Sequence, residues 1–126
     1  MALHILVVDD DADVLAVLVE MLRVSGFIVT AAESGLAMRE ILAEKALLPF
    51  DAVILDCAMP GERSAQLALH AKSLRLPVVM ISGSMEAMNF ADENGLQLLI
   101  KPFRIEGLLS AINEAMASKE FGQRDA

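Results

Sequence analysis

The apolar residues of this chain fall into two alternating patterns: short continuous runs, and longer segments in which they recur every three or four positions. The continuous runs are typical of strands that are buried on both faces of a parallel sheet. The periodic segments are typical of helices that cover such a sheet with one apolar face. The predicted strands are His4–Val8, Phe27–Ala31, Asp51–Leu55, Val78–Ile81 and Leu96–Ile100.

A predicted helix follows each of these strands. The first can begin at Asp11 or Asp13 and ends before Gly26, because glycine commonly follows the last turn of a helix. Ser34 is the expected N-cap of the second helix, in which Leu36 is expected to face inward. The second to fifth helices are predicted over Ser34 to about Leu47, Ser64–Leu74, Met85 to about Glu93 and Ile105 to about Ser118.

Repeats of a strand and a helix, joined by right-handed crossovers, form either an open doubly wound sheet or a closed barrel. At 126 residues the chain is too short for the eight units of a barrel. We therefore predict a single α/β domain over residues 1–118, a doubly wound (βα)5 parallel sheet, followed by a polar, frayed tail over residues 119–126. In such sheets, ligands bind beyond the carboxyl ends of the strands.

Charge and composition argue against several kinds of partner. The net charge is -8, and Lys and Arg together number 10, so the chain lacks the clustered cations with which proteins bind nucleic acid. Charge-free stretches such as Val24–Ala32 and Leu76–Met85 are much shorter than the roughly 20 residues that cross a bilayer. The single cysteine, Cys57, excludes an intramolecular disulfide and fits a reducing compartment. We therefore expect a cytoplasmic protein that binds neither nucleic acid nor a membrane.

Polar residues end four of the predicted strands. They are Asp9, Asp10 and Asp11 after the first strand, Asp56 after the third, Ser82 after the fourth and Lys101 after the fifth. Because neighbouring carboxylates repel one another, such a cluster needs a positive partner, either Lys101 or a divalent cation. Oxygen ligands without His or Cys favour a hard ion, and a few carboxylates plus water suit Mg²⁺ better than Ca²⁺. Asp11 is expected to act only as a helix cap.

The remaining residue types narrow the chemistry of this edge. No predicted strand is followed by either of the glycine-rich phosphate loops that bind nucleotides. Neither His4 nor His70 lies at the carboxyl end of a strand, so a Ser-His pair for nucleophilic catalysis is unsupported. What remains is a carboxylate nucleophile beside a metal, with a hydroxyl and an ammonium group to hold phosphate oxygens. These groups suit phosphoryl transfer onto an aspartate.

Four motifs lie at the ends of the predicted strands. They are V-V-D-D at 7–10, I-L-D-C-A-M-P-G at 54–61, V-V-M-I-S-G at 78–83 and L-I-K-P-F at 99–103. In this order and spacing they resemble a response-regulator receiver domain, the CheY-like module of two-component signalling, over about residues 3–117. The resemblance implies a flavodoxin-like fold with strand order 2-1-3-4-5. It also implies a phosphorelay protein that is not a turnover enzyme, with self-phosphorylation and slow self-hydrolysis only.

The resemblance assigns a role to each acidic residue of the site. Asp56 is the phosphoacceptor and receives its phosphoryl group from a phosphohistidine on a sensor histidine kinase or a histidine phosphotransfer protein. Asp10 and Asp56 bind Mg²⁺ through their carboxylates, and Asp9 assists directly or through water. The backbone carbonyl of Ala58 supplies a further oxygen to the ion.

The resemblance also covers the basic and hydroxyl groups. Lys101 pairs with the phosphoryl group, and its peptide bond to Pro102 is expected to be cis. Ser82 donates a hydrogen bond to a phosphoryl oxygen and carries the change outward. The expected output is an altered surface on the fourth helix, the fifth strand and the fifth helix, which binds an unidentified downstream protein.

The chain departs from the family's pattern at two positions. The family usually has an aromatic residue where this chain has Leu98, and commonly has a glycine where this chain has Ser64. Leu98 argues against an aromatic ring that turns inward on switching, and leaves Ser82 to pull the loop that follows it. Ser84, in that loop, is expected to be only a helix cap.

Three alternatives stay open at this point. A degenerate receiver would act as an interaction module without phosphorylation. A flavodoxin-like FMN carrier shares the winding of the fold, but the chain has no Trp or Tyr to stack on a flavin. A metal-dependent phosphatase with Asp56 as its nucleophile would need a general acid shortly after it, and Cys57, Ala58 and Met59 supply none.

Overall fold

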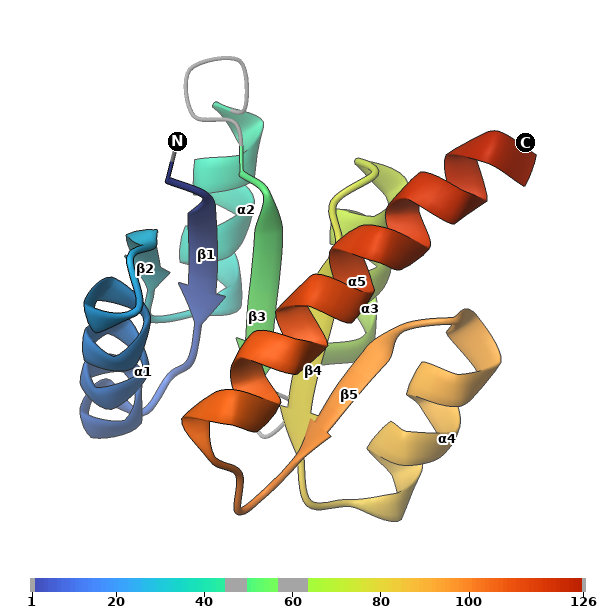
Figure 1. The fold of residues 1–126 in the computed structure, drawn as a ribbon. Coiled ribbons are helices and arrows are strands. Elements are labelled where there is room, and N and C mark those ends of the chain that lie inside the picture. The colour runs from blue at the N-terminus through green and yellow to red at the C-terminus, as the bar shows by residue number, and fades with distance from the viewer. Residues whose placement is uncertain (1, 45–49, 57–63, 126) are drawn as a thin grey trace.

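A parallel sheet of five strands forms the centre of the structure (Figure 1). The computed structural model describes residues 2–44, 50–56 and 64–125, and of residues 118–125 it describes the backbone alone. Within these ranges the strand order is β2-β1-β3-β4-β5, which confirms the predicted doubly wound topology. The strands are β1 (His4–Val8), β2 (Ile28–Ala32), β3 (Ala52–Asp56), β4 (Val78–Ser82) and β5 (Gln97–Ile100).

The position of each strand in the sheet explains its pattern of apolar residues. Every residue of β3 and β4 is buried, because helices cover both faces of the sheet and strands flank both sides. The outer strands β2 and β5 are partly exposed along their free edges. β1 has the predicted bounds, whereas β2 and β3 each begin and end one residue later than predicted.

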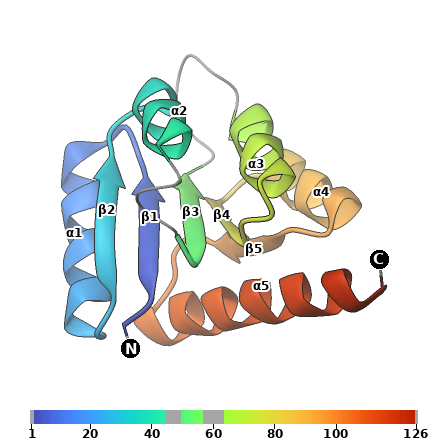
Figure 2. The same cartoon turned by 90° about the horizontal axis from the view of Figure 1, so that it is seen from above.

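Helices form one layer on each face of the sheet (Figure 2). They are α1 (Ala12–Val24), α2 (Gly35–Ala43), α3 (Ser64–Ser73), α4 (Met85–Asn94) and α5 (Ile105–Asp125). α1 and α5 bury Leu15, Leu22, Leu108 and Ile112 on one face. α2, α3 and α4 cover the other face, where the buried side chains form a second apolar cluster around Met38. The sheet thus separates two hydrophobic clusters.

Side-chain caps set the starts of three helices. Asp11 is the N-cap of α1, and its carboxylate accepts the backbone N–H groups of Asp13 and Val14 at 3.0 and 3.2 Å. Ser34 caps α2 and Ser84 caps α4 in the same way. Gly26 follows α1 with a φ of 98°, a conformation that favours glycine. These caps confirm the predicted helix starts.

Three details of the predicted helices were wrong. Leu36 is 68% exposed, because Met38 and Leu42 form the buried face of α2 and Leu36 lies about 200° around the helix from Met38. α2 ends at Ala43 with Glu44 as its C-cap, before the predicted end near Leu47. α5 continues past Ser118 to Asp125, since the residues that follow Ser118 include good helix formers and no proline.

Among the described residues, no helix combines the length and the apolar character that spanning a bilayer requires.

Candidate functional site

Three carboxylates meet where β1 and β3 end. β1 and β3 are neighbours in the sheet with Val8 opposite Leu55, so Asp9 and Asp56, which follow these two residues, come to the same edge. Asp9, Asp10 and Asp56 each offer an oxygen, and these oxygens all lie within 4.8 Å of one another. Asp9 and Asp56 are buried, whereas Asp10 is exposed. The cluster is therefore buried at Asp9 and Asp56 and open to solvent at Asp10.

Asp9 is the most buried member of this cluster, at 1% exposure. A hydrogen bond from Asp9 N–H to the Ala32 carbonyl, at 3.1 Å, extends the pairing of β1 with β2 and fixes its backbone. Its Oδ1 accepts the Asp11 N–H at 2.9 Å, while the buried Oδ2 has no hydrogen-bond partner among the described residues. A buried acceptor without a donor is unfavourable unless a ligand satisfies it.

Burial raises the pKa of Asp9 from 3.8 to about 6, because a desolvated carboxylate is costly to ionise. The hydrogen bond from the Asp11 N–H lowers this pKa, and the nearby charge of Asp56 raises it further. Lys101 contributes a smaller lowering. A cation between the carboxylates would favour the ionised form of Asp9 and offset most of the free-energy cost of ionising it in this buried position.

Lys101 faces Asp56 from the end of β5. Its Nζ lies 3.4 Å from Asp56 Oδ1, and its side chain is 40% exposed. Its backbone N–H donates to the Ser82 carbonyl at 3.1 Å, which joins the ends of β4 and β5. The peptide bond between Lys101 and Pro102 is cis, as the resemblance implied. The ammonium group thus lies beside the carboxylate of Asp56 while keeping contact with solvent.

Ser82 lies at the end of β4, the strand next to β3. Asp56 is opposite Ile81 in this pair of strands, so Ser82 lies one position further toward the carboxyl edge of the sheet. Its side chain is buried. Sheet order and register therefore bring Asp56, Ser82 and Lys101 to the same edge as Asp9, as the sequence predicted from the strand ends.

Ser64 is a contact of the site that sequence reasoning missed. It is buried at the start of α3, and its Oγ donates a hydrogen bond to the backbone carbonyl of Asp56 at 3.2 Å. This bond joins the end of β3 to the first turn of α3. The sequence offered a signal, a hydroxyl residue where the family commonly has glycine, but the residue type alone does not say which group the hydroxyl bonds.

Two positions singled out in the sequence lie outside the described residues, and a third lies in the apolar interior. Ala58, whose carbonyl was expected to bind the metal, lies outside the described residues, as does Cys57. Leu98 is half-buried and packs against the apolar cluster beneath α2, α3 and α4.

The described donors fit a hard divalent cation such as Mg²⁺. All three donors are carboxylates from the ends of adjacent strands. Asp9 Oδ2 has no hydrogen-bond partner among the described residues, and a bound ion would satisfy it. Mg²⁺ prefers oxygen ligands and commonly keeps several water molecules, which the exposed side of the cluster allows.

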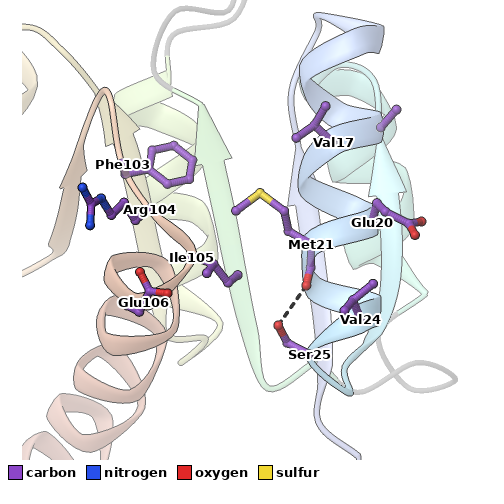
Figure 3. Close-up of a pocket in the computed structure, with 10 residues that line it drawn as sticks. Val17, Glu20, Met21, Val24, Ser25, Phe103, Arg104, Ile105 and Glu106 are labelled. Atoms are coloured by element: carbon purple, nitrogen blue, oxygen red, sulfur yellow. Dashed lines mark hydrogen bonds between the residues drawn. The ribbon is translucent and has the colours of Figure 1, made fainter.

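A separate groove of about 1030 Å³ lies between α1 and the start of α5 (Figure 3). Val17, Met21 and Val24 of α1 form one wall, and Phe103 and Ile105 form the other. Charged residues at its rim are Glu20, Arg104 and Glu106. Its walls are largely apolar, whereas the acidic site is formed by three carboxylates.

Comparison with known proteins agrees with this geometry. The family model for the response regulator receiver domain matches residues 5–113. The chain is 36% identical over 119 residues to the transcriptional regulatory protein PrrA of Mycobacterium tuberculosis, an alignment that covers 86% of this chain and 48% of PrrA. It is 30% identical over 114 residues to protein PetR of Rhodobacter capsulatus, with 87% and 47% covered. The chain thus spans about half the length of these two relatives.

Solved structures give the same result. A response regulator receiver domain protein from Clostridium thermocellum superposes with a TM-score of 0.83 at 27% identity, covering 94% of this chain and 98% of that one. The chemotaxis protein CheY4 of Vibrio cholerae superposes with a TM-score of 0.72 at 25% identity, covering 91% and 99%.

Proposed function

Because this chain belongs to the response regulator receiver domain family, we propose that Asp56 accepts a phosphoryl group in the presence of Mg²⁺. The donor is a phosphohistidine on a sensor histidine kinase or a histidine phosphotransfer protein. The observation that carries this proposal is the meeting of Asp9, Asp10 and Asp56 within 4.8 Å, with Lys101 Nζ 3.4 Å from Asp56. The cytoplasmic location expected from the sequence stays a prediction.

The transfer itself needs one nucleophile and several groups that hold charge. An oxygen of the Asp56 carboxylate bonds to phosphorus while the bond from phosphorus to the donor imidazole nitrogen breaks, and the imidazole keeps that electron pair. Bound Mg²⁺ supplies positive charge for the phosphoryl oxygens. Lys101 Nζ, already beside Asp56, neutralises charge that the incoming group adds. Ser82, at the same edge of the sheet, donates its hydroxyl hydrogen to a phosphoryl oxygen.

Asp9 and Asp10 hold the metal rather than the phosphoryl group. Asp9 is positioned by the Asp11 N–H on one oxygen and offers its other oxygen, Oδ2, to the ion. Asp10, which is exposed, offers an oxygen within 4.8 Å of an oxygen of Asp9 and of one of Asp56. Because the ion relieves the burial of the Asp9 carboxylate, binding of Mg²⁺ and ionisation of Asp9 favour each other.

The output is a changed surface on α4, β5 and α5 that binds another protein. α4 is suited to move because its buried residues, Ala87 and Ala91, are both small. The chain spans about half the length of these two relatives. The proposed partner is therefore defined only as a protein that binds this surface.

Intact mass spectrometry after incubation with Mg²⁺ and acetyl phosphate tests the proposal. Wild type is expected to gain one phosphoryl group, and the gain is expected to disappear with EDTA or in Asp56→Asn. Asp92→Asn, which changes an exposed acid on α4, is the matched control and should gain the group normally. No gain in wild type at any donor concentration would refute the proposal.

A second candidate is an interaction module that works without phosphorylation. Leu98 favours it, because an apolar side chain packed into the cluster under α4 has no hydroxyl or ring edge to reach the site. A partner that binds wild type and Asp56→Asn equally would support this candidate.

A further inference from the structure

One face of α3 carries a buried hydroxyl among apolar side chains. The buried residues of α3 recur at the spacing of a single helix face, and they are Ser64, Leu67, Ala68 and Ala71. The last three are fully buried and pack into the apolar cluster around Met38. Because α3 contacts β3 and β4 (Figure 2), the packing of this face fixes the position of Ser64 relative to the end of β3.

The Ser64 hydroxyl is bonded to the backbone of the proposed phosphoacceptor. A hydroxyl on a buried apolar face is unfavourable unless it is hydrogen-bonded. Ser64 Oγ donates to the backbone carbonyl of Asp56 at 3.2 Å, and both residues are buried. Because water competes little at a buried position, this bond holds its two ends more firmly than the same bond would at the surface. It joins the last residue of β3 to the first residue of α3.

Asp56 lies at the point where the pairing of β3 with its neighbours ends. The register of β1 with β3 extends to Leu55, and the register of β3 with β4 extends to Asp56. The Asp56 carboxylate lies 3.4 Å from Lys101 Nζ and close to the oxygens of Asp9 and Asp10. The backbone at the end of β3 sets where this carboxylate lies, and a nucleophile reacts efficiently only when it is held in the correct geometry. A bond that fixes this backbone therefore bears on the transfer itself.

On the basis of the proposed function, we infer that Ser64 is a positioning residue for the phosphoryl transfer. Its hydroxyl holds the end of β3 so that the Asp56 carboxylate stays aligned with the incoming phosphoryl group. The family commonly has glycine at this position, and a glycine offers no hydroxyl for this bond. Ser64 therefore raises the rate of transfer by acting through Asp56, and it does not act on the donor.

The rate of phosphorylation by acetyl phosphate at saturating Mg²⁺, followed by intact mass spectrometry over a series of donor concentrations, tests this role. Ser64→Ala is expected to lower the maximal rate about fivefold, the equivalent of one hydrogen bond. The donor concentration that gives half of the maximal rate is expected to stay the same, because the bond positions the nucleophile and not the donor. A residue that only stabilised α3 would lower the urea midpoint of the variant and leave the maximal rate of the folded protein unchanged.

Two further variants complete this experiment. Ser73→Ala is the matched control, because Ser73 Oγ donates to the His70 carbonyl at 2.6 Å at an exposed position of the same helix, and it is expected to react like wild type. Ser64→Gly also removes the hydroxyl and is expected to lower the maximal rate at least as much, which keeps the test available if Ser64→Ala folds poorly. A normal maximal rate in either folded Ser64 variant, or an equal fall in Ser73→Ala, would overturn the role of Ser64 and leave the proposed function intact. Failure of wild type to gain a phosphoryl group would overturn both.

Discussion

Replacing Asp9 with asparagine separates two properties of its carboxylate: the free-energy cost of burying a charge, and the use of that charge to bind a metal ion. The carboxylate is buried, its Oδ2 has no hydrogen-bond partner among the described residues, and Asp56 lies close by. Asparagine has nearly the same shape, carries no charge, and keeps an oxygen to accept the Asp11 N–H now held at 2.9 Å. We therefore expect Asp9→Asn to fold more stably than wild type when no divalent ion is present.

The magnitude follows from the raised pKa of Asp9. A pKa of about 6 in the folded protein against 3.8 when unfolded means that the folded state binds protons more tightly. The destabilisation is therefore absent below pH 3.8, grows as the pH rises, and is complete above about pH 6. At pH 7.5 it amounts to about 3 kcal/mol, and at pH 5 to about half of that. We expect Asp9→Asn to recover about 1–3 kcal/mol at pH 7.5.

Urea unfolding at pH 7.5 and pH 5, first with EDTA and then with Mg²⁺, measures this effect. With EDTA, the midpoint of Asp9→Asn at pH 7.5 is expected to lie about 1 M above that of wild type. Mg²⁺ is expected to raise the midpoint of wild type by mass action and to leave Asp9→Asn almost unchanged. Asp10→Asn is the control, because Asp10 is exposed: it should lose the response to Mg²⁺ without gaining stability in EDTA. A variant at Asp9 that is less stable than wild type in EDTA at pH 7.5 would refute the reasoning.

Four other substitutions test the packing and the site. Leu22→Ala removes a fully buried side chain between α1 and the sheet and is expected to cost about 2–5 kcal/mol in urea unfolding, whereas Leu36→Ala, at an exposed position, should stay within about 0.5 kcal/mol; equal effects would contradict the placement of α2. Gly95→Ala is expected to cost about 1 kcal/mol in thermal unfolding because it forces a φ of 65° on a residue with a Cβ, and an unchanged melting temperature would argue against the left-handed end of α4. Lys101→Met is expected to slow phosphorylation by acetyl phosphate at least tenfold; normal phosphorylation would remove Lys101 from the mechanism.

Much of the fold could be predicted from the pattern of residues because each pattern has a direct physical cause. Continuous apolar runs mark strands covered on both faces, and Asp11, Ser34 and Ser84 mark helix starts because their side chains satisfy free backbone N–H groups. Leu36 could not be placed correctly, because an apolar residue in the first turn fits either side of a short helix until the packing partner is known. The strand order came from the family resemblance, since local patterns do not say which strands pair.

The site shows a similar division. Parallel strands end at one edge, so the residue types after each strand placed Asp9, Asp56 and Lys101 at that edge. The family resemblance supplied the strand order that makes the ends of β1 and β3 neighbours. The bond from Ser64 to the Asp56 carbonyl depends on the path of the chain from β3 into α3, which the sequence does not specify. Ser82 Oγ is bonded both to the Ser84 N–H and to Ser84 Oγ. These two bonds depend on side-chain rotamers, which the sequence does not specify.

Because the sheet separates two apolar clusters, the packing on one face can change independently of the packing on the other. The cluster around Leu22 belongs to α1 and α5, and the cluster around Met38 belongs to α2, α3 and α4. Each can lose or rearrange side chains while the other keeps its own packing, so the stability effects of substitutions on opposite faces should add with little interaction. The α4 side of the proposed output surface can therefore repack while the side chains beneath α5, on the other face of the sheet, keep their packing.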